Sequence, residues 1–225
     1  MKDLIIFGTS KYTDLVEHYF CHYTDYKVRG YTMTSDFIHE PEYHGKPVVP
    51  FEKLEKYYSP ERYELFIAVG SNQINESRKR LYLESKARGY QMASFIHPKA
   101  LVDPSAKIGE HCVIMENVVI HAFCEIGEDS IFFPSSAITH ETKIGAHTFV
   151  SSGVIAGGCS SVGEETFLGI SSIINNHHTV GDRCFVAAGA VVTGNLENDT
   201  FLNRNGRVEK IDTRKRHLLS YLLKG

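Results

Sequence analysis

The 225-residue sequence lacks several features that would place it in common functional classes. Its five cysteines are an odd number without paired spacing, which argues against a disulfide framework and is typical of reduced thiols. The formal net charge of −3 leaves no basic footprint for nucleic acid. The apolar run at residues 4–7 is too short for a signal peptide or a membrane span. We therefore expect a cytoplasmic protein that binds no nucleic acid and does not span a membrane.

The first part of the chain alternates strand-like and helix-like patterns. Buried-strand patterns occupy residues 4–7, 27–33 and 65–69, and helix-like patterns occupy residues 12–22 and 74–88. This order predicts a small Rossmann-like parallel sheet with flanking helices, as a first domain over residues 1–97.

The turn after the first strand is Gly8-Thr9-Ser10 and lacks the three spaced glycines of a dinucleotide fingerprint, which argues against an NAD-dependent dehydrogenase. The backbone N–H groups of Thr9 and Ser10, at the start of the helix, are suited to hold a phosphate. Asp36 follows the second strand, where related sheets place a polar group near a nucleotide base or ribose; a solvated loop residue is an equal alternative.

Three further candidates for nucleotide binding follow the third strand. Gly70 closes that strand, and Asn72 and Arg78 begin the next helix, where they suit the edges and phosphates of a uridine or thymidine nucleotide. The alternative is a helix N-cap followed by a surface arginine.

A six-residue aliphatic repeat dominates the second part of the chain. It fits neither a helix nor an alternating strand, but it is typical of a hexapeptide β-helix with three strands and eighteen residues per coil. Glycine follows the repeat at eighteen-residue intervals, from Gly109 to Gly181. We expect about five coils in a domain over residues 98–207. The repeat positions are Val102, Ile108, Ile114, Ile120, Ile126, Phe132, Ile138, Ile144, Val150, Ala156, Val162, Leu168, Ile174, Val180, Val186 and Val192.

Two smaller patterns complete this part. Cys112, Cys124 and Cys184 each stand two residues before a repeat position, so we expect them to fill the coil interior. Residues 208–225 are predicted to form a helical tail, because leucines recur there at helical spacing. Such a helix would pack on the end coil or a neighbouring subunit; contact with a membrane surface is the alternative.

Three segments resemble one enzyme family. They are FIAVGSN at residues 66–72, FIHP at 95–98 and SSAITHE at 135–141. With the hexapeptide repeat, they resemble the bacterial sugar acyltransferases typified by the bacillosamine-pathway N-acetyltransferase and the sialic acid O-acetyltransferase. The resemblance covers residues 3 to about 194. It implies a left-handed β-helix, a homotrimer with sites between subunits, acetyl-CoA as co-substrate and a nucleotide-linked sugar as acceptor, in surface-polysaccharide or glycan sugar biosynthesis.

The resemblance also implies site residues. His140 would act as general base and Glu141 would orient it, which requires the pair to lie at a coil corner. Gly158 lies one coil above His140, about 4.8 Å away, and would stabilise the oxyanion through its N–H; a simple turn glycine is the alternative. Asn176, Ala188 and Gly189 would line the CoA groove, although Asn176 also fits a plain turn, and Phe133 would face the sugar.

We therefore predict N-acylation of a UDP- or dTDP-linked 6-deoxy amino sugar by direct attack, without an acyl-enzyme on Cys159. Sugar O-acetylation of the sialic acid type is the second hypothesis, and a non-catalytic β-helix scaffold is the third. The twelve histidines show no convincing ligand spacing, so no metal is predicted.

Overall fold

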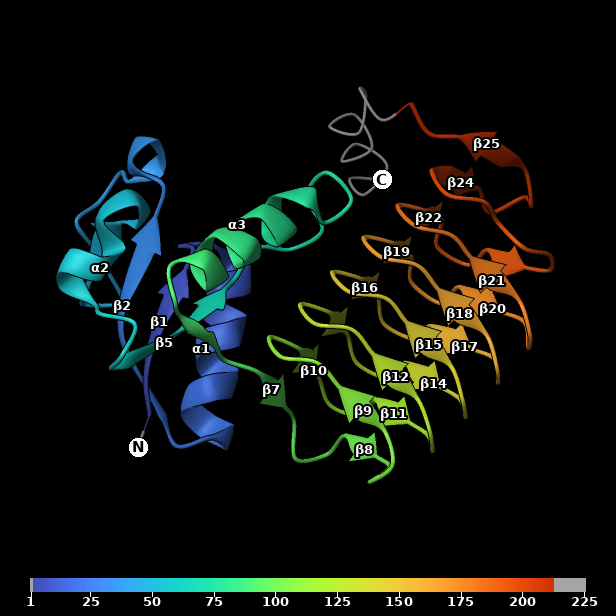
Figure 1. Ribbon diagram of the computed structural model, residues 1–225, viewed down its shortest axis with the longest axis horizontal. Helices are drawn as coiled ribbons and strands as arrows, with labels where there is room; N and C mark the ends of the chain where they lie inside the picture. The colour runs from blue at the N-terminus through green and yellow to red at the C-terminus, as the bar shows by residue number, and fades with distance from the viewer. Residues whose placement is uncertain (1, 213–225) are drawn as a thin grey trace. The chain divides into compact units, whose positions relative to one another are not determined.

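The computed structural model describes residues 2–212 of the chain (Figure 1). Two compact units are present. Unit 1 consists of Met1–Gly70 and Arg80–Phe95, and unit 2 consists of Ser71–Lys79 and Ile96–Gly225. The sequence assigns residues 71–79 to the first domain, but the structure groups them with the β-helix.

Unit 1 contains the predicted parallel sheet. Strand β1 pairs in parallel with β2 on one side and with β5 on the other, and the full order is β3-β4-β2-β1-β5-β6. The predicted strands and the first helix are confirmed, whereas the short β3, β4, β6 and α2 are additions. The elements are β1 (Lys2–Phe7), α1 (Lys11–Tyr23), β2 (Tyr26–Met33), η1 (Ser35–Phe37), β3 (Glu42–Tyr43), β4 (Lys46–Pro50), η2 (Phe51–Lys53), α2 (Leu54–Tyr57), β5 (Tyr63–Ile67) and β6 (Gln91–Met92).

The second long helix, α3 (Glu76–Ala87), begins two residues later than the sequence predicts. Gln73, Ile74 and Asn75 precede it with φ angles of +54°, +51° and +68°, in the left-handed region that L-residues and especially β-branched residues avoid. Buried contacts of this turn within unit 2 offset that strain: Ile74 packs against Phe167 and Phe185.

Unit 2 is a parallel β-helix whose short strands form three sheets, visible as three rows of arrows in Figure 1. Strands one coil apart pair in parallel, so Ile120 lies beside Ile138 and Ile138 beside Ala156, as the eighteen-residue period predicts. The strands are β7 (Phe95–Ile96), β8 (Leu101–Val102), β9 (Lys107–Ile108), β10 (Val113–Ile114), β11 (Val119–Ile120), β12 (Glu125–Ile126), β13 (Ile131–Phe132), β14 (Ala137–Ile138), β15 (Lys143–Ile144), β16 (Phe149–Val150), β17 (Ile155–Ala156), β18 (Ser161–Val162), β19 (Phe167–Leu168), β20 (Ile173–Ile174), β21 (Thr179–Val180), β22 (Phe185–Val186) and β23 (Val191–Val192).

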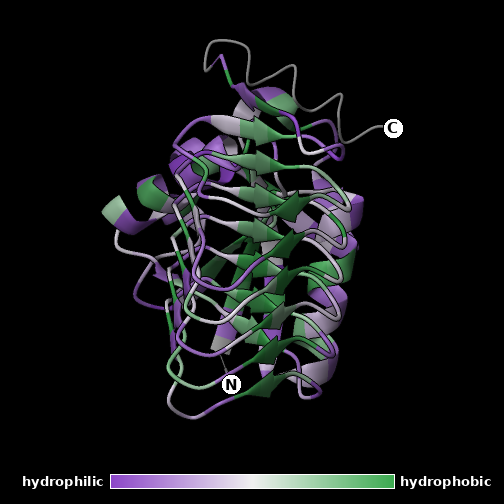
Figure 2. Cartoon of the chain, turned by 90° about the vertical axis from the view of Figure 1, so that its right-hand side faces the viewer, coloured by the Kyte–Doolittle hydropathy of each residue, from purple (hydrophilic) through white to green (hydrophobic). Residues whose placement is uncertain are grey.

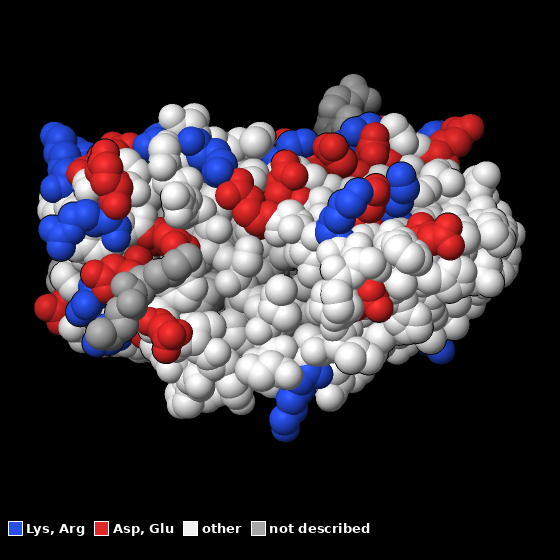
Figure 3. All heavy atoms as spheres, turned by 60° about the horizontal axis from the view of Figure 1, so that its bottom comes forward, with Lys and Arg blue, Asp and Glu red and all other residues white. Residues whose placement is uncertain are grey.

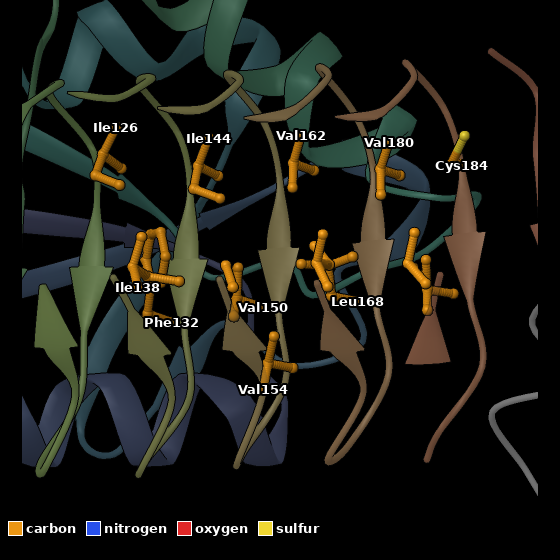
Figure 4. Packing of buried hydrophobic residues seen from close by; sticks show 14 of the residues in the cluster. Ile126, Phe132, Ile138, Ile144, Val150, Val154, Val162, Leu168, Val180 and Cys184 are labelled. Atoms are coloured by element: carbon orange, nitrogen blue, oxygen red, sulfur yellow. The ribbon is translucent and has the colours of Figure 1, made fainter. Parts of the chain in front are cut away.

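The repeat positions point inward and form one continuous core (Figure 4). Cys112, Cys124 and Cys184 are fully buried in it, which confirms their predicted role as interior fillers. The short strands are mostly hydrophobic and the connecting turns more polar (Figure 2). Because each coil buries its apolar residues only by stacking on the next, the core fixes the register of every corner.

The end of the β-helix differs from prediction. Strand β24 (Thr200–Leu202) continues one sheet, and β25 (Val208–Lys210) pairs with it in antiparallel fashion. The predicted helical tail therefore begins as a strand, because an open sheet edge offers unpaired backbone groups to the returning chain. The rest of the predicted helix, residues 213–225, lies outside the described residues. Within residues 2–212, no helix has the length and apolar character needed to cross a bilayer.

Candidate functional site

His140 and Glu141 form the corner between β14 and β15, as their predicted roles require. Glu141 has a φ of +59°, the left-handed conformation that recurs at the coil corners. The two side chains are 58% and 61% exposed, and His140 Nδ1 lies 3.6 Å from Glu141 Oε1. This distance is too long for a hydrogen bond, so no fixed contact joins the carboxylate to the imidazole.

Gly158 lies directly against the imidazole of His140. A Cβ atom at this position would stand 2.6 Å from His140 Nε2, so only glycine fits without moving the ring. The N–H of Cys159 donates to His140 O at 3.0 Å, which holds the two coils in register. Among the described residues the Gly158 N–H makes no hydrogen bond. The corner therefore combines an exposed imidazole with an available backbone donor.

Cys159 joins this corner through coil stacking. Ligand atoms of His140, Glu141 and Cys159 all lie within 4.8 Å of one another. Cys159 is eighteen residues beyond Glu141 and shares its left-handed conformation, with φ of +56°. Histidine spacing along the sequence does not reveal this group; the eighteen-residue period is the signal that connects its members.

The predicted CoA residues lie further along the β-helix. Asn176 occupies the same corner as Gly158, one coil on, and its Oδ1 approaches the position that a Cβ of Gly157 would take. Ala188 and Gly189 are exposed at a different corner, and Gly189 has a φ of +69°, which explains glycine there by conformation alone. Their role in CoA binding stays a prediction.

The His140 corner separates two contrasting faces. On one side, the sheet of β8, β11, β14, β17, β20 and β23 presents only apolar outward side chains, of which Leu101 is 67% exposed and Ile155 43%. On the other side, Lys107, Glu125 and Lys143 form a polar ladder with N–O distances of 3.3 and 3.2 Å. Figure 3, in which the underside of Figure 1 comes forward, shows few charged side chains over its lower face. The outward apolar residues are Leu101, Val119, Ala137, Ile155, Ile173 and Val191.

Unit 1 contains a separate cavity of about 210 Å³ at the carboxyl ends of its strands. Ligands of parallel α/β sheets bind at this edge, which favours it over a larger depression beside the strands' amino ends. Of the residues predicted to bind a nucleotide, only Thr9 lines this cavity. Asp36 is exposed and precedes the lining residue Phe37 in the sequence, and Gly70 does not line the cavity. Its aromatic and acidic wall residues were missed, because they come from the loop before β4. The lining is Thr9, Met33, Phe37, Ile38, His39, Glu40, Glu42, Tyr43 and Val48.

The structure corrects the phosphate role suggested for Ser10. Ser10 is the N-cap of α1, its hydroxyl accepts from the Thr13 N–H, and its own N–H donates to Thr13 Oγ1 at 3.1 Å. This capping box already engages the backbone donor that the prediction assigned to a phosphate.

Arg78 is also not available to a nucleotide, contrary to both sequence interpretations. It is fully buried in unit 2, where its Nε lies 3.0 Å from Asp129 Oδ1 and its Nη2 donates to the carbonyl of His147. His111 and His147 contact the two oxygens of the same carboxylate at 2.7 and 2.8 Å. Asn72 is exposed and does not take part in this cluster. The signal was present in the sequence, since His111, Asp129 and His147 follow one another at the eighteen-residue period.

Burial would raise the pKa of Asp129, but the positive charge of Arg78 and the hydrogen bonds from both histidines outweigh it and hold that pKa far below its ordinary value. The carboxylate is therefore an anion at neutral pH, and it attaches the Ser71–Lys79 segment to the β-helix. Buried and fully surrounded, this group has a structural role.

Phe133 belongs to an outward aromatic row and not to the His140 corner of the same chain. Its ring is 5.1 Å from Phe149, and the row continues through Phe167 and Phe185. The predicted contact with the sugar stays a prediction.

Comparison with known proteins agrees with the fold. A family model described as the GMPPB C-terminal domain matches residues 96–201. The acetyltransferase domain of PglB from Neisseria gonorrhoeae is 24% identical, with a TM-score of 0.81 over 94% of this chain and 100% of that chain. PerB from Caulobacter crescentus, solved with CoA and GDP-perosamine, is 25% identical, with a TM-score of 0.81 over 93% of this chain and 98% of that one.

The predicted acyltransferase class and co-substrate agree with these neighbours. The PglB domain was also solved with acetyl coenzyme A. Variants of the Caulobacter enzyme with one histidine replaced by alanine or asparagine were solved with CoA and GDP-perosamine. The predicted fold class, a small parallel sheet followed by a left-handed β-helix, is confirmed. In architecture, and over nearly its whole length, the protein is similar to the hexapeptide-repeat sugar N-acyltransferases, as the sequence indicates.

Proposed function

We propose that this protein is an acetyl-CoA-dependent N-acetyltransferase that acts on a nucleotide-linked amino sugar, with His140 as general base. The observation that supports this most is the contact between an exposed imidazole and Gly158 at one coil corner. A structural histidine would be buried and surrounded by partners, as His147 is. His140 instead presents its Nε2 edge next to a backbone donor.

The reaction follows from the two groups at this corner. The sugar amine attacks the thioester carbonyl, forming a C–N bond while His140 takes a proton from the nitrogen. Charge develops on the carbonyl oxygen, and the Gly158 N–H donates to it. Collapse breaks the C–S bond, and CoA leaves as a thiolate that accepts the proton from His140. Glu141 lies beside the imidazole, and no acyl group resides on Cys159.

The nucleotide would bind to unit 1, in the cavity lined by Thr9 and Tyr43. Its position at the carboxyl ends of β1 and β2 suits a phosphate chain, and Phe37, which is 61% exposed, offers an aromatic face to a base. We expect a UDP- or dTDP-linked 6-deoxy amino sugar.

The active form would be a homotrimer whose subunits meet through the apolar sheet face described above. Apolar residues repeat there over all the coils and remain exposed, as at Leu101 and Ile155, which is unusual for a monomer surface. The His140 corner borders this face, so the neighbouring subunit would complete the site. Replacement Ile155→Lys should convert the assembly to monomers with loss of turnover, as measured by light scattering and thiol release.

The decisive experiment measures thiol release from acetyl-CoA with UDP-, dTDP- and GDP-linked amino sugars and with free sialic acid. Turnover of a nucleotide-linked amino sugar, with the acetyl group on nitrogen by NMR, is the expected result. Turnover of sialic acid alone would replace N-acylation by O-acetylation. If calorimetry detects no binding of CoA, the scaffold hypothesis replaces both.

A further inference from the structure

His140, Glu141 and Cys159 present three different ligand types at one corner of the β-helix. An imidazole nitrogen, a carboxylate oxygen and a thiol sulfur lie within 4.8 Å of one another. This combination is the donor set of zinc, which binds histidine, cysteine and carboxylate ligands in a tetrahedral arrangement. Magnesium and calcium, in contrast, prefer oxygen ligands alone.

The backbone holds these donors in place. Glu141 and Cys159 occupy equivalent corner positions on successive coils, with φ of +59° and +56°, so their side chains leave the backbone in similar directions. The hydrogen bond from Cys159 N–H to His140 O, 3.0 Å long, fixes the separation of the coils. The pairing of β14 with β17 continues this register into the sheet.

The side chains can close the remaining gap. Donor atoms around a tetrahedral zinc ion are about 3.5 Å apart, so modest rotations from the present spacing suffice. His140 and Glu141 are 58% and 61% exposed, which leaves them free to rotate. Their exposure also leaves a fourth coordination position open to solvent.

We propose that this corner is an inhibitory zinc site, in which Cys159 serves as a metal ligand and not as a catalytic group. The metal would occupy the lone pair of His140 that takes the proton during acyl transfer. The inhibition, but not the metal binding, rests on the proposed function. As a metal ligand, Cys159 would make the enzyme sensitive to zinc without contributing to turnover.

Metal binding is tested on the untagged full chain with Co²⁺, whose bond to a thiolate produces a charge-transfer absorption in the near ultraviolet. We expect this absorption in the native protein and its loss in Cys159→Ser. The matched control is Cys21→Ser, because Cys21 is the other cysteine that is not buried and it lies in unit 1. It should retain the absorption. An unchanged absorption in Cys159→Ser would overturn the proposal.

Inhibition is tested with Zn²⁺ in the thiol-release assay, followed by reversal with EDTA. Replacing a residue that only hydrogen-bonds to a metal ligand lowers metal affinity by about 10- to 100-fold. Because Cys159 would be a ligand itself, Cys159→Ser should raise the half-inhibitory zinc concentration at least as much. Its turnover without zinc should match the native rate. Stimulation by zinc would contradict the inhibitory role.

The two experiments separate this inference from the proposed function. Cobalt absorption without acetyl transfer would retain the metal site and remove the acetyltransferase proposal. Acetyl transfer without cobalt absorption would remove the metal site alone.

Discussion

Two corners of the β-helix place a histidine beside a carboxylate, but they differ in burial and in the number of partners around the carboxylate. At one corner Asp129 is fully buried and is contacted by Arg78, His111 and His147. At the other, His140 and Glu141 are more than half exposed and 3.6 Å apart. A histidine beside a carboxylate thus has a structural role where every polar atom is surrounded, and a proposed chemical role where the imidazole is left accessible.

The two corners also differ in how much a substitution would destabilise the fold. Forming a buried ion pair changes the stability of the fold little, because the cost of desolvation offsets the attraction. Removing one partner is strongly destabilising, because the remaining charge is buried without water around it. An exposed pair contributes little to stability, since solvent screens it. Substitutions at the first corner should therefore affect folding, and substitutions at the second should affect turnover.

The largest effect is expected from Asp129→Asn, which leaves Arg78 buried without its counter-charge. The free energy of unfolding should fall by about 3–5 kcal/mol, as measured by urea denaturation at fixed protein concentration. Asparagine tolerates the φ of +53° at this position, so backbone strain does not contribute. The control Glu125→Gln removes an exposed carboxylate and should leave stability nearly unchanged. Equal losses in both variants would refute the distinction.

The pH dependence of that loss tests its electrostatic origin. Because the pKa of Asp129 is held far below its ordinary 3.8, the charged carboxylate contributes stability in full above about pH 4. That contribution declines as the pH falls through the folded-state pKa. The difference in stability between the native protein and Asp129→Asn should therefore be constant near neutral pH and shrink below about pH 4. A difference that shrinks between pH 8 and pH 6 instead would point to the histidines.

The next largest effect is expected from replacing one histidine at each corner by asparagine. His140→Asn should lower kcat by about 10²-fold or more with an unchanged melting temperature, since it removes the proposed base. His147→Asn should lower the melting temperature and leave kcat of the folded enzyme close to native, because its ring binds the buried carboxylate of Asp129. If both variants lose activity in proportion to stability, His140 is not a base.

Gly158→Ala tests the space beside His140. The added Cβ would stand 2.6 Å from Nε2 and must displace the ring, so kcat should fall by about 10- to 100-fold. Gly194→Ala is the matched control, because a Cβ there meets nothing within 4 Å. Native kcat in Gly158→Ala, measured by thiol release, would show that the glycine serves only the turn.

The smallest effect is expected from Glu141→Gln. The carboxylate is exposed and makes no hydrogen bond of normal length to His140, so its charge is worth only a few-fold in kcat, about 1 kcal/mol or less. The effect should weaken further as salt is added. A loss as large as that of His140→Asn would mean that the carboxylate orients the base directly in the complex with substrates.

Much of this molecule was predictable because a β-helix translates sequence spacing into spatial contact. The inward repeat, the buried cysteines and the neighbouring positions of His140 and Gly158 all follow from the period of eighteen. Of the residues predicted to bind a nucleotide, only Thr9 lines the cavity of unit 1. The wall of its cavity comes from the irregular segment before β4, where no periodicity relates one residue to the next.

The sequence by itself determined the repeat, the fold class and the corner that holds the candidate base, since backbone pairing in a solenoid depends on spacing alone. Only the tertiary structure decided which ionisable residues are enclosed. Arg78 was predicted as a nucleotide contact or a surface arginine, and it is buried because a left-handed turn at residues 73–75 directs its helix start onto the β-helix, where Asp129 neutralises its charge. Burial depends on what covers a residue, and that information lies elsewhere in the chain.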